Sequence, residues 1–75
     1  MLAYVMVQMT DAEEQSFIQE MRRRIKVEEV HILFGEWDVI VKLRGDSPQD
    51  IAKFVIDHIR NHEYVSLTST HIVAE

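Results

Sequence analysis

The first apolar stretch of the chain covers residues 2–9 and has the sequence LAYVMVQM. It is short, and only Gln8 interrupts it. A run of this length without strict alternation of polar and apolar positions is typical of a strand that is buried on both faces. We therefore expect residues 2–9 to form a central strand of a sheet.

The next segment has the pattern of an amphipathic helix. Its apolar side chains recur at helical spacing, at Phe17, Ile18, Met21 and Ile25. Thr10 and Glu13 have the spacing of a capping box, and Asp11 would add an acid to the first turn. Basic residues crowd the far end, where cations suit the helix dipole. We expect a helix over residues 11–24.

Two apolar runs on either side of Gly35-Glu36 predict a β-hairpin. Glycine at the first position of a two-residue loop suits a type II′ turn. One face of this hairpin pairs Phe34 with Trp37, Ile32 with Val39 and Val30 with Val41, and the other pairs Leu33 with Asp38, His31 with Ile40 and Glu29 with Lys42. The first three pairs are apolar and the last joins opposite charges, so a slip by one residue would scramble both faces.

The pattern of a second amphipathic helix covers residues 48–61. Ser47 fits its N-cap, Pro48 its first position and Asp50 its third. The predicted buried stripe consists of Ile51, Phe54, Val55, His58 and Ile59. Residues 64–75 are rich in β-branched side chains and predict a closing strand.

The predicted order of elements is therefore βαββαβ. Right-handed crossovers place both helices on one face of a four-stranded antiparallel sheet. This arrangement is the ferredoxin-like plait, an α+β fold, and we expect one domain over residues 1–75.

The opposite face of this sheet is not cleanly polar. Ile40 and Leu33 lie on it, and the central strand adds one of two sets of side chains. These sets are Ala3, Val5, Val7 and Met9, or Leu2, Tyr4 and Met6. A solvated sheet face alternates to polar residues, and apolar burial stabilises by about 25 cal/mol per Å². We infer that this face packs against a second copy of the chain, sheet to sheet.

Composition narrows the classes of function. The chain has 75 residues, 13 acidic against 8 basic, and a net charge of −5, which argues against direct binding to DNA phosphates. It has no cysteine, which excludes disulfides and thiolate metal sites. The apolar run of residues 1–7 lacks a basic flank and is too short for a signal peptide or a membrane span. We expect a cytoplasmic protein.

The sequence contains no phosphate-binding glycine loop, nucleophile elbow or HExxH motif. His58 and His62 are four residues apart on a predicted helix, a spacing that can hold a metal. No third ligand is suggested by spacing, and His58 falls on the apolar stripe, so packed histidines are the simpler interpretation. The basic cluster of residues 22–26 could contact nucleic acid or an acidic partner, but a solvated helix end explains it more simply.

The hairpin and the last strand hold the polar residues that are least explained by the fold. An acid such as Asp38 is unfavourable in a β-run; it could prevent edge pairing or receive the ammonium group of a small ligand. Trp37 is predicted to face the helices and pack in the core. Thr68 and Thr70 share one strand face while Ser69 points to the other. They are either ordinary strand residues or hydroxyls offered to a polar ligand.

Three segments, residues 3–9, 27–43 and 65–73, together resemble the effector-binding RAM domain of the Lrp/AsnC family of transcriptional regulators. The family pattern is a Gly-x-aromatic-Asp turn and a closing segment of Val-x-x-Thr-x-Thr type. Here these are Gly35 to Asp38 and Val65 to Thr70. The family has glycine where Glu63 or Tyr64 stands, a departure that would alter the loop before the last strand. It usually carries an N-terminal helix-turn-helix domain, which we expect to be absent from this chain.

The resemblance implies dimers that assemble into octamers or decamers, with small effectors, often amino acids, bound between dimers. It assigns ligand binding to Gly35, Glu36, Trp37 and Asp38 on the turn and to Thr68, Ser69 and Thr70 on the closing strand. Gly35 would offer backbone groups, and Asp38 would take the ammonium group. The three closing residues would supply hydroxyl or backbone contacts.

The predicted function is a non-enzymatic, cofactor-free module for amino-acid sensing and oligomerisation, which could modulate a full-length regulator of this family by co-assembly. The alternative is a cofactor-free monooxygenase or isomerase of the dimeric α+β barrel type. His31, His58 or His71 would then be the general base. That reading requires a deep pocket lined by a histidine with a perturbed pKa.

Overall fold

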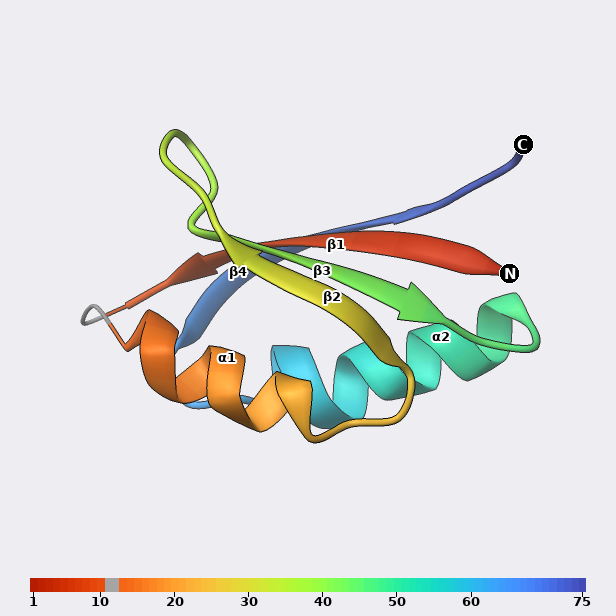
Figure 1. The fold of residues 1–75 in the computed structure, drawn as a ribbon, viewed down its shortest axis with the longest axis horizontal. Coiled ribbons are helices and arrows are strands. Elements are labelled where there is room, and N and C mark those ends of the chain that lie inside the picture. The colour runs from red at the N-terminus through yellow and green to blue at the C-terminus, as the bar shows by residue number, and fades with distance from the viewer. Residues whose placement is uncertain (11–12) are drawn as a thin grey trace.

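The structure is a computed structural model that describes residues 1–10 and 13–75. Its elements are β1 (Leu2–Met9), α1 (Glu14–Arg22), β2 (Val27–Ile32), β3 (Val39–Arg44), α2 (Pro48–Phe54), the π-helix η1 (Val55–Arg60) and β4 (Val65–Ile72). The strands form one antiparallel sheet in the order β2-β3-β1-β4, and the helices cover one of its faces (Figure 1). The predicted ferredoxin-like plait is confirmed. No helix within the described ranges is long and apolar enough to cross a membrane.

The core lies between the sheet and the helices. It contains Ala3, Val5, Val7, Phe17, Ile18, Met21, Val30, Val39, Val41, Leu43, Ile51, Phe54, Val55 and Ile59. Ala3, Val5 and Val7 of β1 are fully buried in it, and Met9 is partly buried against it. The other set, Leu2, Tyr4 and Met6, therefore lies on the open face of the sheet, because successive side chains of a strand point to opposite faces.

The start of α1 differs from the prediction. The helix begins at Glu14, and its N-cap residue, Glu13, makes no side-chain capping bond. The hydroxyl of Thr10 donates to the Tyr64 carbonyl at 3.3 Å, so it ties the end of β1 to the segment before β4. The predicted capping box is therefore wrong, and the expected role of Asp11 lies outside the described residues.

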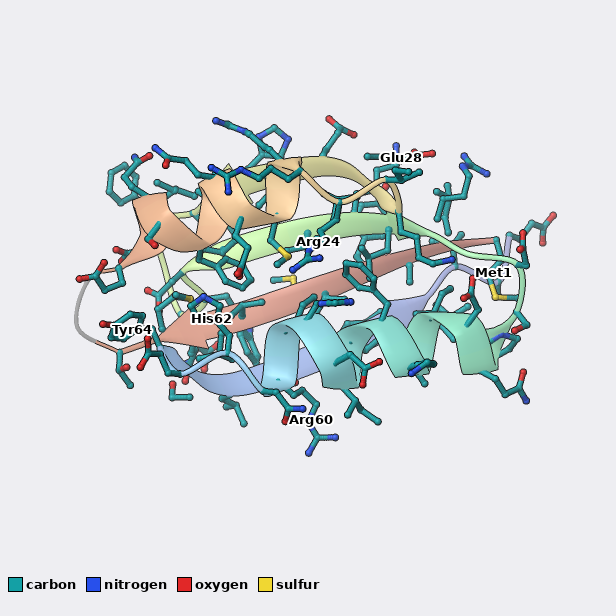
Figure 2. The ribbon with its side chains drawn as sticks, turned by 90° about the horizontal axis from the view of Figure 1, so that it is seen from below. Met1, Arg24, Glu28, Arg60, His62 and Tyr64 are labelled. Atoms are coloured by element: carbon teal, nitrogen blue, oxygen red, sulfur yellow. The ribbon has the colours of Figure 1, made fainter. Side chains whose placement is uncertain are left out.

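The end of α1 also differs from the prediction. Because the helix ends at Arg22, Ile25 falls in the following turn and is fully exposed instead of extending the apolar stripe. Arg22 and Arg23 are exposed, as expected for a solvated helix end. Arg24 is different: Figure 2 shows its side chain between the two helices, and its Nε is buried without a hydrogen-bond partner in the described part of the chain.

The second helix begins as its sequence predicts. The Ser47 hydroxyl accepts a hydrogen bond from the Asp50 amide at 3.0 Å, and Pro48 occupies the first turn. Its second half, η1, is a π-helix, in which Asn61 N donates to the carbonyl of Ile56, five residues earlier. The predicted stripe is buried apart from His58, which is half-buried.

The predicted hairpin register is confirmed. Ile32 pairs with Val39, His31 with Ile40, Val30 with Val41 and Glu29 with Lys42. The expected charge pair forms, with 3.3 Å between Lys42 Nζ and Glu29 Oε2. A bulge at Glu28 follows, and its carboxylate contacts both Lys42 and Arg44. The sheet edge formed by β2 is therefore held by ion pairs on the open face.

Asp50 joins α2 to the turn before β2, and this contact predicts how stability depends on pH. Its carboxylate accepts hydrogen bonds from Lys26 Nζ at 2.7 Å and from the Asp46 amide at 3.0 Å. These bonds, that from Lys26 first, hold the pKa of Asp50 below its ordinary value of 3.8. A carboxyl with a lowered folded-state pKa stabilises the fold at neutral pH, and this contribution disappears as the pH falls through the folded-state value.

We expect Asp50→Asn to lower the free energy of unfolding at neutral pH, and the gap to the unmodified chain to shrink below about pH 4. Urea unfolding at neutral pH and at about pH 3 measures both values. Glu63→Gln, at an exposed acid, is the control and should show no such convergence. An Asp50→Asn gap of equal size at both pH values would contradict the expectation.

Candidate functional site

The segment between β2 and β3 is a six-residue loop, residues 33–38, and not the predicted two-residue turn. Leu33 N donates to Asp38 O at 2.8 Å, which closes the loop at its base. Gly35 has φ +139°, a conformation that residues with a Cβ rarely adopt. The loop rises from the sheet on the side away from the helices (Figure 1). It therefore projects from the open face.

The two aromatic residues of this loop do not pack in the core. Phe34 is fully exposed at the tip, and Trp37 is half-buried. The predicted Phe34–Trp37 pair and the predicted core position of Trp37 are both wrong. The physical reason is that the loop leaves the plane of the sheet after Ile32, so the alternation of the strands does not extend to it.

Three hydrogen bonds tie the loop to the end of β1. Asp38 N donates to Val7 O at 2.9 Å, and Gln8 Nε2 donates to Glu36 O at 2.8 Å. The Asp38 carboxylate accepts the amide of Met9 at 2.7 Å, next to a register shift between Gln8 and Met9. Asp38, which strand propensity did not explain, thus accepts a hydrogen bond from the Met9 amide. Without it, the irregular end of β1 would leave this amide unpaired.

The three predicted residues of β4 divide between two faces. Thr68 and Thr70 pair with Val7 and Val5, whose side chains are buried under the helices, so both threonines face the helix side. Ser69 pairs with Met6 on the open face, and its hydroxyl lies 2.8 Å from the His71 ring. The structure therefore brings Thr68 and Thr70 together and separates Ser69 from them.

A groove of about 590 Å³ runs between β4 and the helix formed by α2 and η1. It is lined by Ala52, Val55, Ile56 and Arg60 from the helix and by Val65, Ser66, Leu67, Thr68 and Thr70 from the strand. Sequence reasoning missed its helical wall. The signal was the row Ala52, Ile56, Arg60, spaced by four residues beside the buried stripe.

The loop and the groove flank β1 from opposite sides. Asp38 bonds to Val7 from the β3 side, and Thr68 is the partner of Val7 on the β4 side. Because neighbouring strands lie about 4.8 Å apart, the backbones of Asp38 and Thr68 are about 10 Å apart. Within one chain, the two parts of the predicted site therefore do not form one cavity.

Comparison with known proteins places this geometry in a family. The sequence pattern of the Lrp/AsnC ligand binding domain matches residues 2–75. The chain belongs to this family. Domains of the Lrp/AsnC family oligomerise and bind small-molecule effectors such as amino acids.

Several known proteins are similar to this chain over part or all of its length. An uncharacterized HTH-type transcriptional regulator of Pyrococcus abyssi is 39% identical over 46 residues, which are 61% of this chain and 31% of that protein. The chain thus spans about a third of the length of the curated relatives that it matches. The crystal structure of FFRP-DM1 matches with a TM-score of 0.91 and 26% identity over 96% of both chains. A transcriptional regulator of Neisseria meningitidis, solved as a complex with L-Met, shares the fold with a TM-score of 0.90, 21% identity and coverage of 99% of this chain and 49% of that one.

The histidines of this Lrp/AsnC domain all have contacts elsewhere. His58 packs on the Phe54 ring with 4.9 Å between centroids. His62 packs edge-on against Phe17 at 5.2 Å and lies 3.3 Å from Glu20 Oε2. His31 lies 3.4 Å from Glu29 Oε1. Among the described residues no group of three or more His, Asp or Glu side chains could hold a metal ion, and none of the histidines lines the groove.

The contact between Asp38 and the Met9 amide gives a stability prediction. Asp38→Ala leaves a partly buried amide without its acceptor, and we expect the free energy of unfolding to fall by about 1–3 kcal/mol. Asp38→Asn keeps an acceptor oxygen and should cost less. In a domain of this size each kcal/mol corresponds to about 4–8 °C in melting temperature. Equal melting temperatures for Asp38→Ala and the unmodified chain would show that the carboxylate does not hold β1.

Proposed function

We propose that this chain is a non-enzymatic module that binds an amino acid between copies of itself and couples that binding to assembly. The observation that carries the proposal is the groove beside β4. It places the hydroxyl-bearing Thr68 and Thr70 opposite a helical wall of Ala52, Val55 and Ile56 that ends at Arg60. Small-molecule sites are typically concave, mostly apolar and of about 300–1,000 Å³, with a few polar groups that fix orientation. The groove is within that range.

The loop of one copy and the groove of another together supply what an amino acid needs. In this proposal Asp38 of a neighbouring copy takes the ammonium group, since Asp38 of the same chain lies across β1. Gly35, Glu36 and Trp37 accompany it on the projecting loop. Ser69 contributes to the contact between copies, because its register places it on the open face. The Neisseria regulator solved with L-Met supports an amino acid as the ligand class.

The open face supports the assembly part of the proposal. Leu2, Met6 and Ile40 are half-buried there, Tyr4 is 36% exposed and Leu67 is 52% exposed. These side chains form an apolar strip across β3, β1 and β4, bordered by the ion pair of Glu29 and Lys42. Packing of this strip against its two-fold copy buries it and gives a dimer. Further assembly into octamers or decamers, and co-assembly with a full-length regulator of the family, extend the same proposal.

Titration with each of the twenty amino acids tests the ligand. We expect at least one to raise the melting temperature by on the order of ten degrees at 100-fold over its Kd, because such occupancy adds about 2.7 kcal/mol per site. Calorimetry measures the affinity. If none of the twenty at millimolar concentration gives heat or stabilisation, amino-acid binding is excluded and only the assembly role stands.

Isosteric substitutions locate the site. Thr70→Val and Thr68→Val remove a hydroxyl and keep the β-branched shape, so each should weaken binding by about tenfold while the fold persists. Ser69→Ala, on the other face of β4, should weaken binding less, because in this proposal it acts only through the contact between copies. Ser16→Ala, at an exposed position of α1, is the control and should leave affinity unchanged. The reverse order, with Ser69→Ala the more damaging, would place the ligand on the open face.

A charge placed on the open face tests the dimer. Met6→Asp puts a carboxylate in the centre of the proposed interface, where desolvation is costly. We expect light scattering after size exclusion to show a smaller assembly than for the unmodified chain. Gln15→Asp, on the exposed side of α1, is the control and should leave the mass unchanged. A Met6→Asp variant of unchanged mass would refute sheet-to-sheet packing.

A further inference from the structure

Arg60 is the cation of the groove. It is exposed at the end of η1 and lines the groove together with Thr68 and Thr70. In Figure 2 its side chain points away from α1, toward the edge of the molecule along which β4 runs. Four other cations, Lys26, Lys42, Arg44 and Lys53, each contact an acid. Arg60 forms no ion pair with any described residue.

The strand wall of the groove presents backbone donors. β4 is an edge strand of the sheet, and β1 is its only partner among residues 1–10 and 13–75. Val73 N donates to Leu2 O at 2.8 Å, and bonded positions alternate along an antiparallel pair. The odd-numbered residues of β4 therefore form the backbone hydrogen bonds to β1. Thr68 and Thr70 are even-numbered, so their N–H and C=O groups point to the free edge of the sheet.

The hydroxyls of the same two threonines are also available. Both side chains face the helix side, and neither hydroxyl bonds to any residue in the described part of the chain. A guanidinium, two outward amides and two hydroxyls along one groove form a set of hydrogen-bond donors. Such a set matches a carboxylate, because arginine recognises carboxylates through two parallel hydrogen bonds.

The helical wall of the groove determines which side chain the bound carboxylate compound can carry. Ala52, Val55 and Ile56 face the groove from the helix, and Val65 closes its end. These side chains are aliphatic, and no acidic residue of the described part of the chain lines the groove. An apolar side chain is therefore favoured over a cationic one at this position, since a cation would find no partner on this wall.

We infer that Arg60 binds the α-carboxylate of the effector, and that the effector class is an amino acid with a free carboxylate and an aliphatic side chain. This inference rests on the proposed function and adds to it the anchoring residue and the substrate class. Thr68 and Thr70 orient the carboxylate from the strand, and the helical wall receives the aliphatic side chain.

The test compares each aliphatic amino acid with its carboxamide, using leucine and leucinamide, valine and valinamide, and methionine and methioninamide as probes. Calorimetry gives the affinity of both members of each pair for the unmodified chain and for Arg60→Gln. We expect the unmodified chain to prefer the acid by about 10- to 100-fold. Arg60→Gln should remove most of that preference and change the affinity of the amide less than about threefold.

Two further variants show whether the charge of Arg60, the shape of its guanidinium or a change in overall charge determines the preference for the acid. Arg60→Lys keeps the charge without the planar fork and should restore part of the preference. Arg23→Gln removes an exposed cation at the end of α1 and should change neither affinity. Circular dichroism confirms that every variant is folded before its affinity is compared.

The outcomes distinguish the two proposals. If an amino acid binds the unmodified chain and the acid-to-amide ratio is the same in Arg60→Gln, Arg60 is not the anchor, although the proposed function stands. If no amino acid binds the unmodified chain, both fail. If an extended peptide binds this edge regardless of its terminal carboxylate, strand addition is the role of the groove and the inference is overturned.

Discussion

The alternation of side chains along β1 decides on which side of the sheet every other residue lies. Ala3, Val5 and Val7 are fully buried under the helices, so their partners on both neighbouring strands face the same way. That constraint directs Thr68 and Thr70 into the groove, and it leaves Tyr4 and its neighbours on the open face. A slip of β1 by one residue would bury a tyrosine and a glutamine and would expose the centre of the core.

Much of this arrangement could be predicted from the sequence, because it follows from local pattern and from pairing across a short loop. The hairpin register is an example, since its apolar pairs permit only one alignment. What failed depends on contacts distant in the chain. Asp38 bonds to Val7 and Met9 at the end of β1, and Trp37 lies beside it on a six-residue loop outside the core. Thr68 and Thr70 were singled out from the sequence, whereas Arg60 was not, because only the folded chain brings the end of the second helix beside the last strand.

In the proposed function, the positions of the loop (residues 33–38) and the groove link ligand binding to assembly. The loop projects from one side of β1, and the groove lies on the other side, so an effector that contacts both must join two copies. Such a ligand stabilises the assembled state over the free chains, and assembly in turn raises the affinity for the ligand by the same factor. The domain then requires no internal hinge to respond to its effector, since the change lies in which copies are in contact.

The unpaired edge of β4 is also the place where this chain is most open to the wrong partner. An exposed row of backbone donors and acceptors is a template for any extended segment, including β4 of another molecule. The strand has β-branched residues and no proline or lysine to prevent such pairing. An occupied groove would cover part of this edge. Under the proposed function, effector shortage would therefore affect solubility as well as signalling, and the same ligand would also stabilise the free chain against aggregation.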